Sequence, residues 1–425
     1  MSKSSWVDGL SAIESHSQTK HRVLETYLRR YFEVRCGLLQ RDSFKITLVD
    51  GFAGGGMYRL ADGQPWRGSP LIMLHVVHEM QAAERARRQK KPFSIDARFI
   101  FVERDPAHAR ALREQIRLDP VSAEFEGRID VLEGAVETQL EPIIASVKRH
   151  SPRSGTSLFF LDPFGYDGVL PLAQRVIARL PKTEVILNFM VDDLINHLSD
   201  RESMAQILAR NQLPSVNGAL PYIAELKSEE DWRRPIQFLL HKDIWQQSKA
   251  RFFTPFYITR EGSNRAYWLV HLSGAARARD VMVQVHWEFQ NSSLHYGSAG
   301  LEMFGESVQQ AVSLGYRATR DDALLEQRPL FKFGAADRLR TMNALVEDIP
   351  RKLDEVGGSM TVAQFFDRHC NFTPANLMML RESTGQLLEA GALEKIVGPD
   401  GEIRRSAGAI TDDDLIVLRK QQRLF

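Results

Sequence analysis

Residues 156–166 are Thr-Ser-Leu-Phe-Phe-Leu-Asp-Pro-Phe-Gly-Tyr, a short apolar run that ends in a carboxylate, a proline, an aromatic residue and a glycine. The apolar part follows the turn-forming Gly155 and has the length of a buried strand. Pro163 restricts the backbone of Asp162, and Gly165 lets the chain pass close to a ligand. Such a strand places Asp162 at the carboxyl edge of a sheet, where open α/β folds bind ligands. Taken alone, the pattern also fits a strand that simply ends in an Asp-Pro turn.

The chemistry at this edge suits a flat ligand that carries an amino group. A ring can stack on Phe164 while its exocyclic amine donates a hydrogen bond to Asp162 or to a backbone carbonyl. Nucleobases have this shape, so the stretch predicts a site for a nucleobase.

Predicted strands and helices alternate along the chain before and after this stretch. Five strands with intervening helices predict a mostly parallel, doubly wound sheet covered on both faces. Two further strands, at residues 253–259 and 267–271, are predicted to form an antiparallel hairpin that completes the sheet. The five predicted parallel strands lie at residues 44–50, 97–102, 128–132, 156–161 and 184–189.

The first strand enters a glycine-rich loop, as in Rossmann-like nucleotide-binding folds. Residues 50–58 are Asp-Gly-Phe-Ala-Gly-Gly-Gly-Met-Tyr, which is neither the dinucleotide fingerprint nor a P-loop. Glu103 ends the next strand, where an acidic residue accepts hydrogen bonds from ribose hydroxyls. Near the start of the first helix, Lys20 and His21 are placed to reach an anionic group of a ligand, or to lie in a solvated first turn.

Three parts are expected: an N-terminal helical segment at 1–43, a Rossmann-like domain at 44–330 and a winged-helix domain at 335–425. Residues 192–250 are predicted to be a helical insertion that covers the edge near Asp162, or that simply packs on the sheet. In the last part, three helices precede a hairpin formed by residues 392–397 and 402–405, which is the pattern of a winged helix. Residues 287–330 show no clear pattern.

The basic residues give two competing candidates for a nucleic-acid surface. The first is the run that contains Arg87, Arg88, Lys90 and Lys91, which is otherwise a solvated helix end. The second is the winged helix, with Arg381, Arg404 and Arg405. Because residues 335–425 hold 12 Lys and Arg against 14 Asp and Glu, this module is equally compatible with docking a protein.

Composition narrows the class of protein. The formal net charge is +1, so a nucleic-acid surface has to come from a local patch. Two cysteines, Cys36 and Cys370, form neither a disulfide framework nor a zinc site and favour a reducing cytoplasm. No apolar run approaches the roughly 20 residues that span a bilayer, so no membrane association is expected.

Several motifs in combination resemble the three-Cys-motif partner (TcmP) family over about residues 15–300. They are residues 50–58, Gly-Ser-Pro at 68–70, Phe-Val-Glu at 101–103 and Leu-Asp-Pro-Phe-Gly at 161–165, with residues 184–189 in the same pattern. The resemblance implies a Rossmann-like fold similar to S-adenosylmethionine-dependent amino methyltransferases. It also implies a partner with three cysteines, similar to radical enzymes that hold an iron–sulfur cluster.

The resemblance assigns roles to individual residues. The cofactor S-adenosylmethionine would be held by the loop after the first strand, by Glu103 at the ribose and by the segment from Asp130 to Gly134 beside the adenine. Lys20, which the resemblance does not assign, is added as a cofactor contact from its place near the start of the first helix. The loop residues are Asp50, Gly51, Phe52, Ala53, Gly54 and Gly56. The catalytic stretch would be Asp162, Pro163, Phe164, Gly165 and Tyr166. This stretch departs from the Asp/Asn-Pro-Pro-aromatic motif of amino methyltransferases, so either Phe164 or Tyr166 would be the stacking ring, or the substrate is not a stacked base.

The sequence therefore favours a methyltransferase that acts on an exocyclic amine of a nucleobase, in DNA more than in RNA. The alternatives are a non-catalytic, DNA-binding partner of a three-Cys-motif radical enzyme in DNA repair or phage defence, and a nuclease that uses the acidic strand ends. The nuclease lacks a carboxylate and lysine arrangement with metal-ligand spacing.

Overall fold

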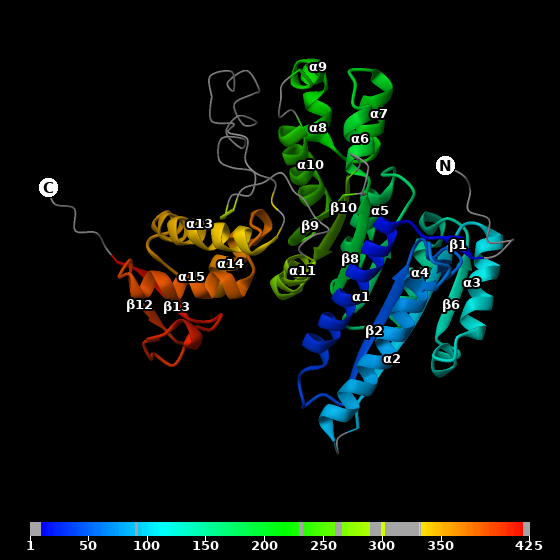
Figure 1. Ribbon diagram of the computed structural model, residues 1–425, viewed down its shortest axis with the longest axis horizontal. Coiled ribbons are helices and arrows are strands. Elements are labelled where there is room, and N and C mark those ends of the chain that lie inside the picture. The colour runs from blue at the N-terminus through cyan, green and yellow to red at the C-terminus, as the bar shows by residue number, and fades with distance from the viewer. Residues whose placement is uncertain are drawn as a thin grey trace. The chain divides into compact units, whose positions relative to one another are not determined.

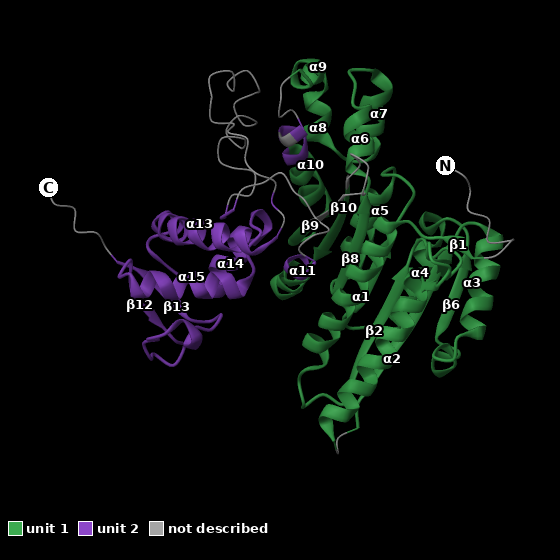
Figure 2. Cartoon of the chain, viewed as in Figure 1, with its two compact units in different colours: residues 1–230, 239–285 green, residues 231–238, 286–425 purple. Residues whose placement is uncertain are grey.

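The structure is a computed structural model that describes residues 10–89, 92–228, 233–259, 266–289, 299–301, 331 and 333–419. The chain forms two compact units, one of residues 1–230 and 239–285 and the other of residues 231–238 and 286–425 (Figure 2). Residues 287–330, whose sequence shows no clear pattern, lie largely outside the described residues. Each unit has its own apolar core and is described by itself.

The first unit is built on a seven-stranded sheet in the order β6-β5-β2-β7-β8-β10-β9. The strands β6, β5, β2, β7 and β8 are parallel, while β10 is antiparallel to both of its neighbours. This is the mostly parallel, doubly wound α/β fold with an antiparallel hairpin that the sequence predicted. The strands are β2 (Ser43–Asp50), β5 (Ser94–Glu103), β6 (Ile129–Glu133), β7 (Ser157–Leu161), β8 (Thr183–Phe189), β9 (Phe252–Thr259) and β10 (Ala266–Ser273).

Helices cover both faces of this sheet (Figure 1). Successive parallel strands run outward from β2 to β6 and then from β7 to β8, so right-handed connections place α2 and α3 on one face and α4 and α5 on the other. The first helix, α1, packs beside α2. The helices are α1 (Ser15–Cys36), α2 (Ser69–Arg88), α3 (Pro106–Leu118), α4 (Val136–His150), α5 (Val169–Arg179) and, after β10, α11 (Ala276–Glu288).

Local sequence explains where these elements begin. All five residues of β7 are buried, as expected of a central strand covered on both faces. Asp105 caps α3 by accepting a hydrogen bond from the Ala107 amide at 2.8 Å, and Pro106 follows as the first helical residue. The N-cap of α2 is Gly68, and Pro70 lies in the first turn of this helix.

The predicted helical insertion follows β8. It consists of α6 (Val191–His197), α7 (Glu202–Arg210), α8 (Pro214–Ala219), α9 (Ile223–Leu226) and α10 (Arg233–Ser248), with a short 3-10 turn at Leu220–Tyr222. A small sheet of β1 (Ser11–Ala12), β3 (Met57–Arg59) and β4 (Pro65–Arg67) was not predicted. Its strands are too short to show a pattern of alternation. A further 3-10 turn at Ser122–Phe125 precedes β6.

The second unit is a winged helix. Its helices are α13 (Ala335–Asp354), α14 (Val362–His369) and α15 (Leu377–Glu389), and its sheet has the order β11-β13-β12. The strands are β11 (Ser359–Thr361), β12 (Leu393–Val397) and β13 (Leu415–Leu418), and 3-10 turns lie at Cys370–Phe372 and Ala407–Ala409. Thr361 caps α14 in a reciprocal capping box with Gln364, as its sequence indicates.

The predicted wing is partly wrong. Residues 402–405 make only a single bridge, from Ile403 to Val397, and the partner of β12 is β13, which was missed. Arg404 explains the difference, because its guanidinium bonds to Asp414 at 3.1 Å and so ties the segment after β12 to the turn that precedes β13. The aliphatic side chains of Leu415 to Leu418 then take the place in the sheet that residues 402–405 were expected to fill.

Candidate active site

The site lies where the strand order of the sheet reverses. The neighbouring strands β2 and β7 end at Asp50 and Leu161, and the chain then runs outward in opposite directions on the two sides. Ligands of open α/β sheets bind in the crevice outside the carboxyl ends of the strands at this point. The glycine-rich loop and Asp162 therefore meet at one edge, as predicted.

Asp162 is held by two partners. The Lys20 ammonium, from the start of α1, donates to both carboxylate oxygens at 2.6 Å, and the side-chain amide of Asn188 donates to Oδ1 at 2.8 Å. The side chains of Lys20 and Asp162 are 6% and 18% exposed. Lys20 is thus a buried site residue and not part of a solvated first turn, and its position is against Asp162.

Asn188 is a site residue whose role the sequence did not single out. It is buried near the carboxyl end of β8, next to β7 in the sheet. Its Nδ2 atom bonds to Asp162, while its Oδ1 atom is buried and has no hydrogen-bond partner in the described part of the chain. A buried carbonyl oxygen without a partner is costly, so this atom marks a place for a donor from a ligand.

Asp50 is a second carboxylate with an unused acceptor. Its Oδ1 atom accepts from the Phe52 amide at 3.0 Å, whereas its buried Oδ2 atom has no partner among the described residues. Burial raises the pKa of Asp50 to about 7, with smaller raising effects from the Asp162 and Glu103 carboxylates, and the bonds from Ser69 and Phe52 work in the opposite direction. Asp50 is therefore suited to a cationic or hydrogen-bonding group of a ligand.

The glycine-rich loop folds over Glu103. The amides of Gly54 and Asp105 each donate to one Glu103 oxygen at 2.8 Å. Gly54 has a φ of +61°, and a Cβ atom at this position would lie 2.8 Å from the Tyr58 hydroxyl. Gly56 has a φ of +85°, so both glycines hold a left-handed backbone that other residues rarely adopt. Each Glu103 oxygen keeps a lone pair for a ligand hydroxyl.

Aromatic and imidazole side chains lie beside Lys20. His21 accepts a hydrogen bond from the Trp66 indole at 3.0 Å, and its ring lies 5.8 Å from that of Tyr58. Burial lowers the pKa of His21 to about 4, so this imidazole is neutral at physiological pH. Tyr58 ends the motif at residues 50–58 and lies on β3, whereas Trp66, on β4, was not predicted to belong to the site because these strands are too short to show a pattern.

The loop after β7 presents one ring to solvent. Pro163 is buried, Phe164 is fully exposed and Gly165 has a φ of +112°. Tyr166 is half-buried, with its ring 6.2 Å from the ring of Phe189. Phe164 therefore provides an uncovered face for stacking, whereas Tyr166 packs at the end of β8.

Of the two residues expected beside the adenine, Gly134 lies at the carboxyl edge of the sheet and Asp130 lies further back in β6. Gly134 directly follows β6, and its amide donates to the Glu103 carbonyl at 3.0 Å, so it lies at the predicted edge. Asp130 pairs in register with Ile100, three residues before the Glu103 and Glu133 pair, which is roughly 10 Å along the strand. Its carboxylate bonds to Arg98, and the structure does not bring Asp130 to the site.

The basic run at the end of α2 does not form an open cationic surface in the described part of the chain. The Arg88 side chain is fully buried and donates to the carbonyls of Cys36, Leu38 and Arg41, so its expected contact with phosphate is wrong. Arg87 is more exposed and is paired with Glu84 at 2.7 Å. Lys90 and Lys91 lie outside the described residues.

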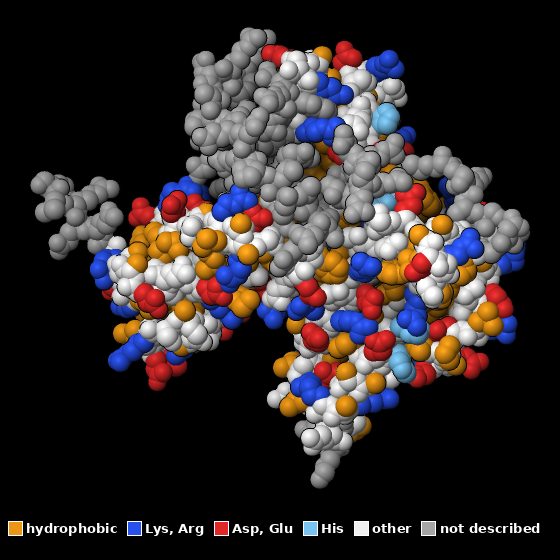
Figure 3. Space-filling view, in the orientation of Figure 1, with side chains coloured by type: hydrophobic (Ala, Val, Ile, Leu, Met, Phe, Trp, Pro, Cys, Tyr) orange, Lys and Arg blue, Asp and Glu red, His pale blue; other side chains and the backbone are white. Residues whose placement is uncertain are grey.

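The predicted cations of the winged helix are mostly paired as well. Arg381 bonds to Asp412, and Arg404 bonds to Asp400 and Asp414 within the wing. Arg405 is exposed. On the face of this unit in Figure 3, blue, red and orange side chains are intermixed, without a continuous basic stripe.

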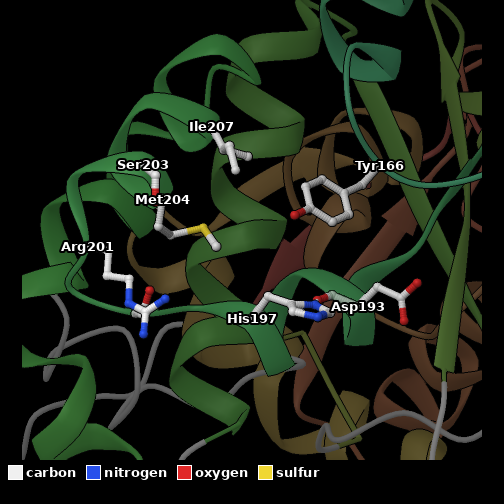
Figure 4. A pocket seen from close by; sticks show the side chains of 8 residues that line it. Tyr166, Asp193, His197, Arg201, Ser203, Met204 and Ile207 are labelled. Atoms are coloured by element: carbon white, nitrogen blue, oxygen red, sulfur yellow. The ribbon is translucent and has the colours of Figure 1, made fainter.

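A hollow of about 410 Å³ lies between the loop after β7 and the helical insertion (Figure 4). Tyr166 comes from the loop, and the remaining lining residues come from α6, α7 and the turn between them: Asp193, His197, Ser199, Arg201, Ser203, Met204 and Ile207. Within the described residues, no group of His, Cys, Asp and Glu side chains is placed to hold a metal ion, and no helix is long and apolar enough to cross a bilayer.

Comparison with known proteins identifies part of the second unit. Residues 315–399 match the family model of the GMT-like wHTH domain. No curated protein matches the chain.

Three similar solved structures show the range of the likeness. Protein LPL1258 from Legionella pneumophila, of family model DUF519, is 11% identical over 61% of this chain and 85% of its own, with a TM-score of 0.34. An O-methyltransferase from Bacillus cereus in complex with SAH is 12% identical over 63% and 95%, with a TM-score of 0.29. The human methyltransferase 10 domain-containing protein is 12% identical over 59% and 83%, with a TM-score of 0.25. At these values the likenesses assign no reaction to this chain.

Proposed function

We propose that the chain is an S-adenosylmethionine-dependent methyltransferase that acts on an exocyclic amine of a nucleobase, in DNA more than in RNA. One observation carries this proposal: the glycine-rich loop, Glu103 and Asp162 converge at the switch point of the sheet. The matched GMT-like wHTH domain supports a nucleic-acid partner.

The residues present fit the proposed cofactor. The unpartnered Oδ2 atom of Asp50 suits its ammonium group, and the two oxygens of Glu103 suit its ribose hydroxyls. Gly134 lies at the same edge, next to Glu103. When bound, this cofactor supplies a methyl group on a sulfonium, which is already electrophilic.

The protein then mainly has to position the acceptor amine. Asp162 and the Oδ1 atom of Asn188 supply two adjacent acceptors, which match the two hydrogens of an exocyclic amine. Asn188 and Lys20 hold the Asp162 carboxylate in place, and this carboxylate would take the proton that the nitrogen loses. The exposed ring of Phe164 provides the stacking surface for the base.

A second candidate function assumes the same fold but no methyl transfer. In it, the chain is a non-catalytic DNA-binding partner of a three-Cys-motif iron–sulfur protein. The bonds from Lys20 to both Asp162 oxygens favour this alternative, because the acceptor carboxylate is already paired. Consumption of S-adenosylmethionine separates the two functions.

The test is titration of the purified chain with S-adenosylmethionine by calorimetry, followed by transfer of labelled methyl to DNA and RNA. We expect micromolar binding that Asp50→Ala and Glu103→Ala abolish. We also expect Asp162→Ala to reduce transfer at least about 100-fold while binding persists. The control is Glu126→Ala, an exposed carboxylate in the turn before β6. Absence of binding at millimolar cofactor would reject the methyltransferase, and binding without transfer to any nucleic acid would favour the partner role.

A further inference from the structure

The hollow beside the loop after β7 has no role in the proposed chemistry, yet its two ends are lined by side chains of opposite charge. Figure 4 shows Arg201 at one end, Tyr166 and Asp193 at the other, and His197 between them. Its volume, about 410 Å³, falls within the range of roughly 300–1,000 Å³ that is usual for small-molecule sites. One end therefore offers a cation, and the other offers an aromatic ring and an acceptor.

Hydrogen bonds join the helical insertion that lines this hollow to the loop after β7. Arg210, at the end of α7, pairs with Asp167 at 2.7 Å, and the Asn211 side chain donates to Asp167 at 2.9 Å. Asn211 also accepts from the Gly168 amide at 2.7 Å. Tyr166 belongs to both the loop and the hollow, so the hollow adjoins the loop that carries Phe164.

The side chains in the hollow have defined hydrogen-bonding roles. His197 Nδ1 donates to the Asp193 carbonyl at 2.5 Å, so its Nε2 atom is an acceptor in the neutral ring. Burial raises the pKa of Tyr166, with further raising effects from the carboxylates of Asp167 and Asp193, so its hydroxyl remains a donor at neutral pH. Arg201 is exposed and offers the planar donor array that binds phosphate.

We propose that this hollow binds the nucleotide adjoining the target base, with the backbone phosphate at Arg201 and the sugar and base toward Tyr166 and Asp193. This inference rests on the proposed function, because a nucleic-acid acceptor is assumed. The shared chemistry is a phosphodiester, which DNA and RNA both supply. A base displaced from its helix brings its flanking nucleotides with it, and a site that holds one of them reads the sequence context.

The test uses the full chain and short single-stranded oligonucleotides, one DNA and one RNA, labelled for fluorescence anisotropy. The variants are Arg201→Gln and His197→Gln, and the matched control is Arg179→Gln, an arginine of α5 that pairs with Glu141 and does not line the hollow. S-adenosylmethionine affinity is measured on each variant in parallel as a check of the fold. Competition by a nucleoside and by its 5′-monophosphate then separates recognition of the base from recognition of the phosphate.

We expect Arg201→Gln to weaken oligonucleotide binding about tenfold and to reduce the slope of log affinity against log salt by about 0.7, the value for one contact with a single strand. The monophosphate should compete better than the nucleoside against the native chain and equally with it against Arg201→Gln. Oligonucleotide binding by Arg201→Gln equal to that of the native chain, with cofactor binding intact, would overturn this inference and leave the proposed function standing. A native chain that binds oligonucleotide through Arg201 but binds no cofactor would overturn only the proposed function. Whichever of the DNA and RNA oligonucleotides binds more tightly identifies the source of the phosphate.

Discussion

The ion pair of Lys20 and Asp162 joins α1 to the carboxyl edge of the sheet. Removal of one partner from a buried pair leaves an uncompensated charge, at a cost of about 3–5 kcal/mol. We therefore expect Lys20→Met to destabilise the chain by about this amount and the double variant Lys20→Met/Asp162→Asn to be much less destabilised than the sum of its singles. Urea unfolding of the four proteins in a double-mutant cycle measures the coupling. Helix α1 should stay docked, because Tyr27 also hydrogen-bonds His271 at 3.0 Å and Glu184.

The matched control for this cycle is on the same helix. Arg29 is paired with Glu25 at 2.9 Å, with a side chain that is 36% exposed. Arg29→Met should cost no more than about 1 kcal/mol, as is usual for surface pairs. Equal losses for Lys20→Met and Arg29→Met, or strict additivity in the cycle, would show that burial does not strengthen the Lys20 pair.

Asp50 makes stability and ligand affinity depend on pH. Its folded pKa of about 7 is above the ordinary value of 3.8, so between these values the folded state holds a proton that the unfolded state has lost. Stability therefore falls as pH rises from about 4 to about 7 and is flat above, with a total change of up to about 4 kcal/mol from this group. Asp50→Asn should remove this slope in urea unfolding from pH 5 to pH 8. In the native chain, affinity for S-adenosylmethionine should rise with pH up to about 7, because the ionised carboxylate binds the ammonium better. An identical pH profile in Asp50→Asn would refute this role.

At the residue scale, strand ends were predictable and strand interiors were not. Asp50, Glu103 and Asp162 come directly at or after a strand, and parallel strands bring these positions to one edge. Asp130 was misplaced because its position within a strand depends on register, which a short apolar pattern does not fix. Arg88 was misplaced because a basic run does not show which side chain faces inward to bond with backbone carbonyls.

At the element scale, a matched pair of substitutions is offered by Gly54 in the glycine-rich loop and Gly63 in the turn between β3 and β4. Gly54 and Gly63 have φ values of +61° and +88°, so alanine strains the backbone at both positions by a similar amount, about 1 kcal/mol. A Cβ atom at Gly54 also meets the Tyr58 hydroxyl at 2.8 Å, whereas one at Gly63 meets nothing within 4 Å. We expect similar small losses of stability, with a loss of S-adenosylmethionine affinity of at least about tenfold in Gly54→Ala alone. Calorimetric titration of both variants with S-adenosylmethionine measures this difference. Equal affinities would place the cofactor away from the glycine-rich loop.

Long periodic elements were predictable, and short ones were not. The alternation of strands and helices correctly predicted the sheet and its antiparallel hairpin. The wing was mispredicted because residues 402–405 follow a turn and resemble a return strand, while Arg404 in fact binds Asp414 and the sheet closes through β13. Ion pairs of this kind join residues across a loop, and neither spacing nor propensity reveals them.

At the scale of the whole molecule, charge does not identify the nucleic-acid surface. The net charge is +1, and the suspected cations Arg88, Arg381 and Arg404 are paired with acidic side chains. In the winged helix, ion pairs within the unit therefore occupy two of the arginines that were expected to contact phosphate. Exposed Arg201 and Arg405 are better candidates, one in each compact unit.

The two compact units lead to a prediction for the unfolding of the whole chain. Each has its own buried core, with Leu48, Leu158 and Leu187 in the sheet and Leu345 and Ile416 in the winged helix. We expect two transitions in scanning calorimetry. S-adenosylmethionine at 100 times its dissociation constant should stabilise only the first unit, by about 2.7 kcal/mol, which corresponds to a shift of a few degrees.

Leu345→Ala assigns these transitions. Loss of this fully buried side chain costs about 2–5 kcal/mol and should lower only the transition of the winged helix. The shift caused by the cofactor should remain in this variant and disappear in Asp50→Ala. One cooperative transition that moves with both changes would mean that the units unfold together, and a shift of the winged-helix transition by the cofactor would place its site outside the sheet.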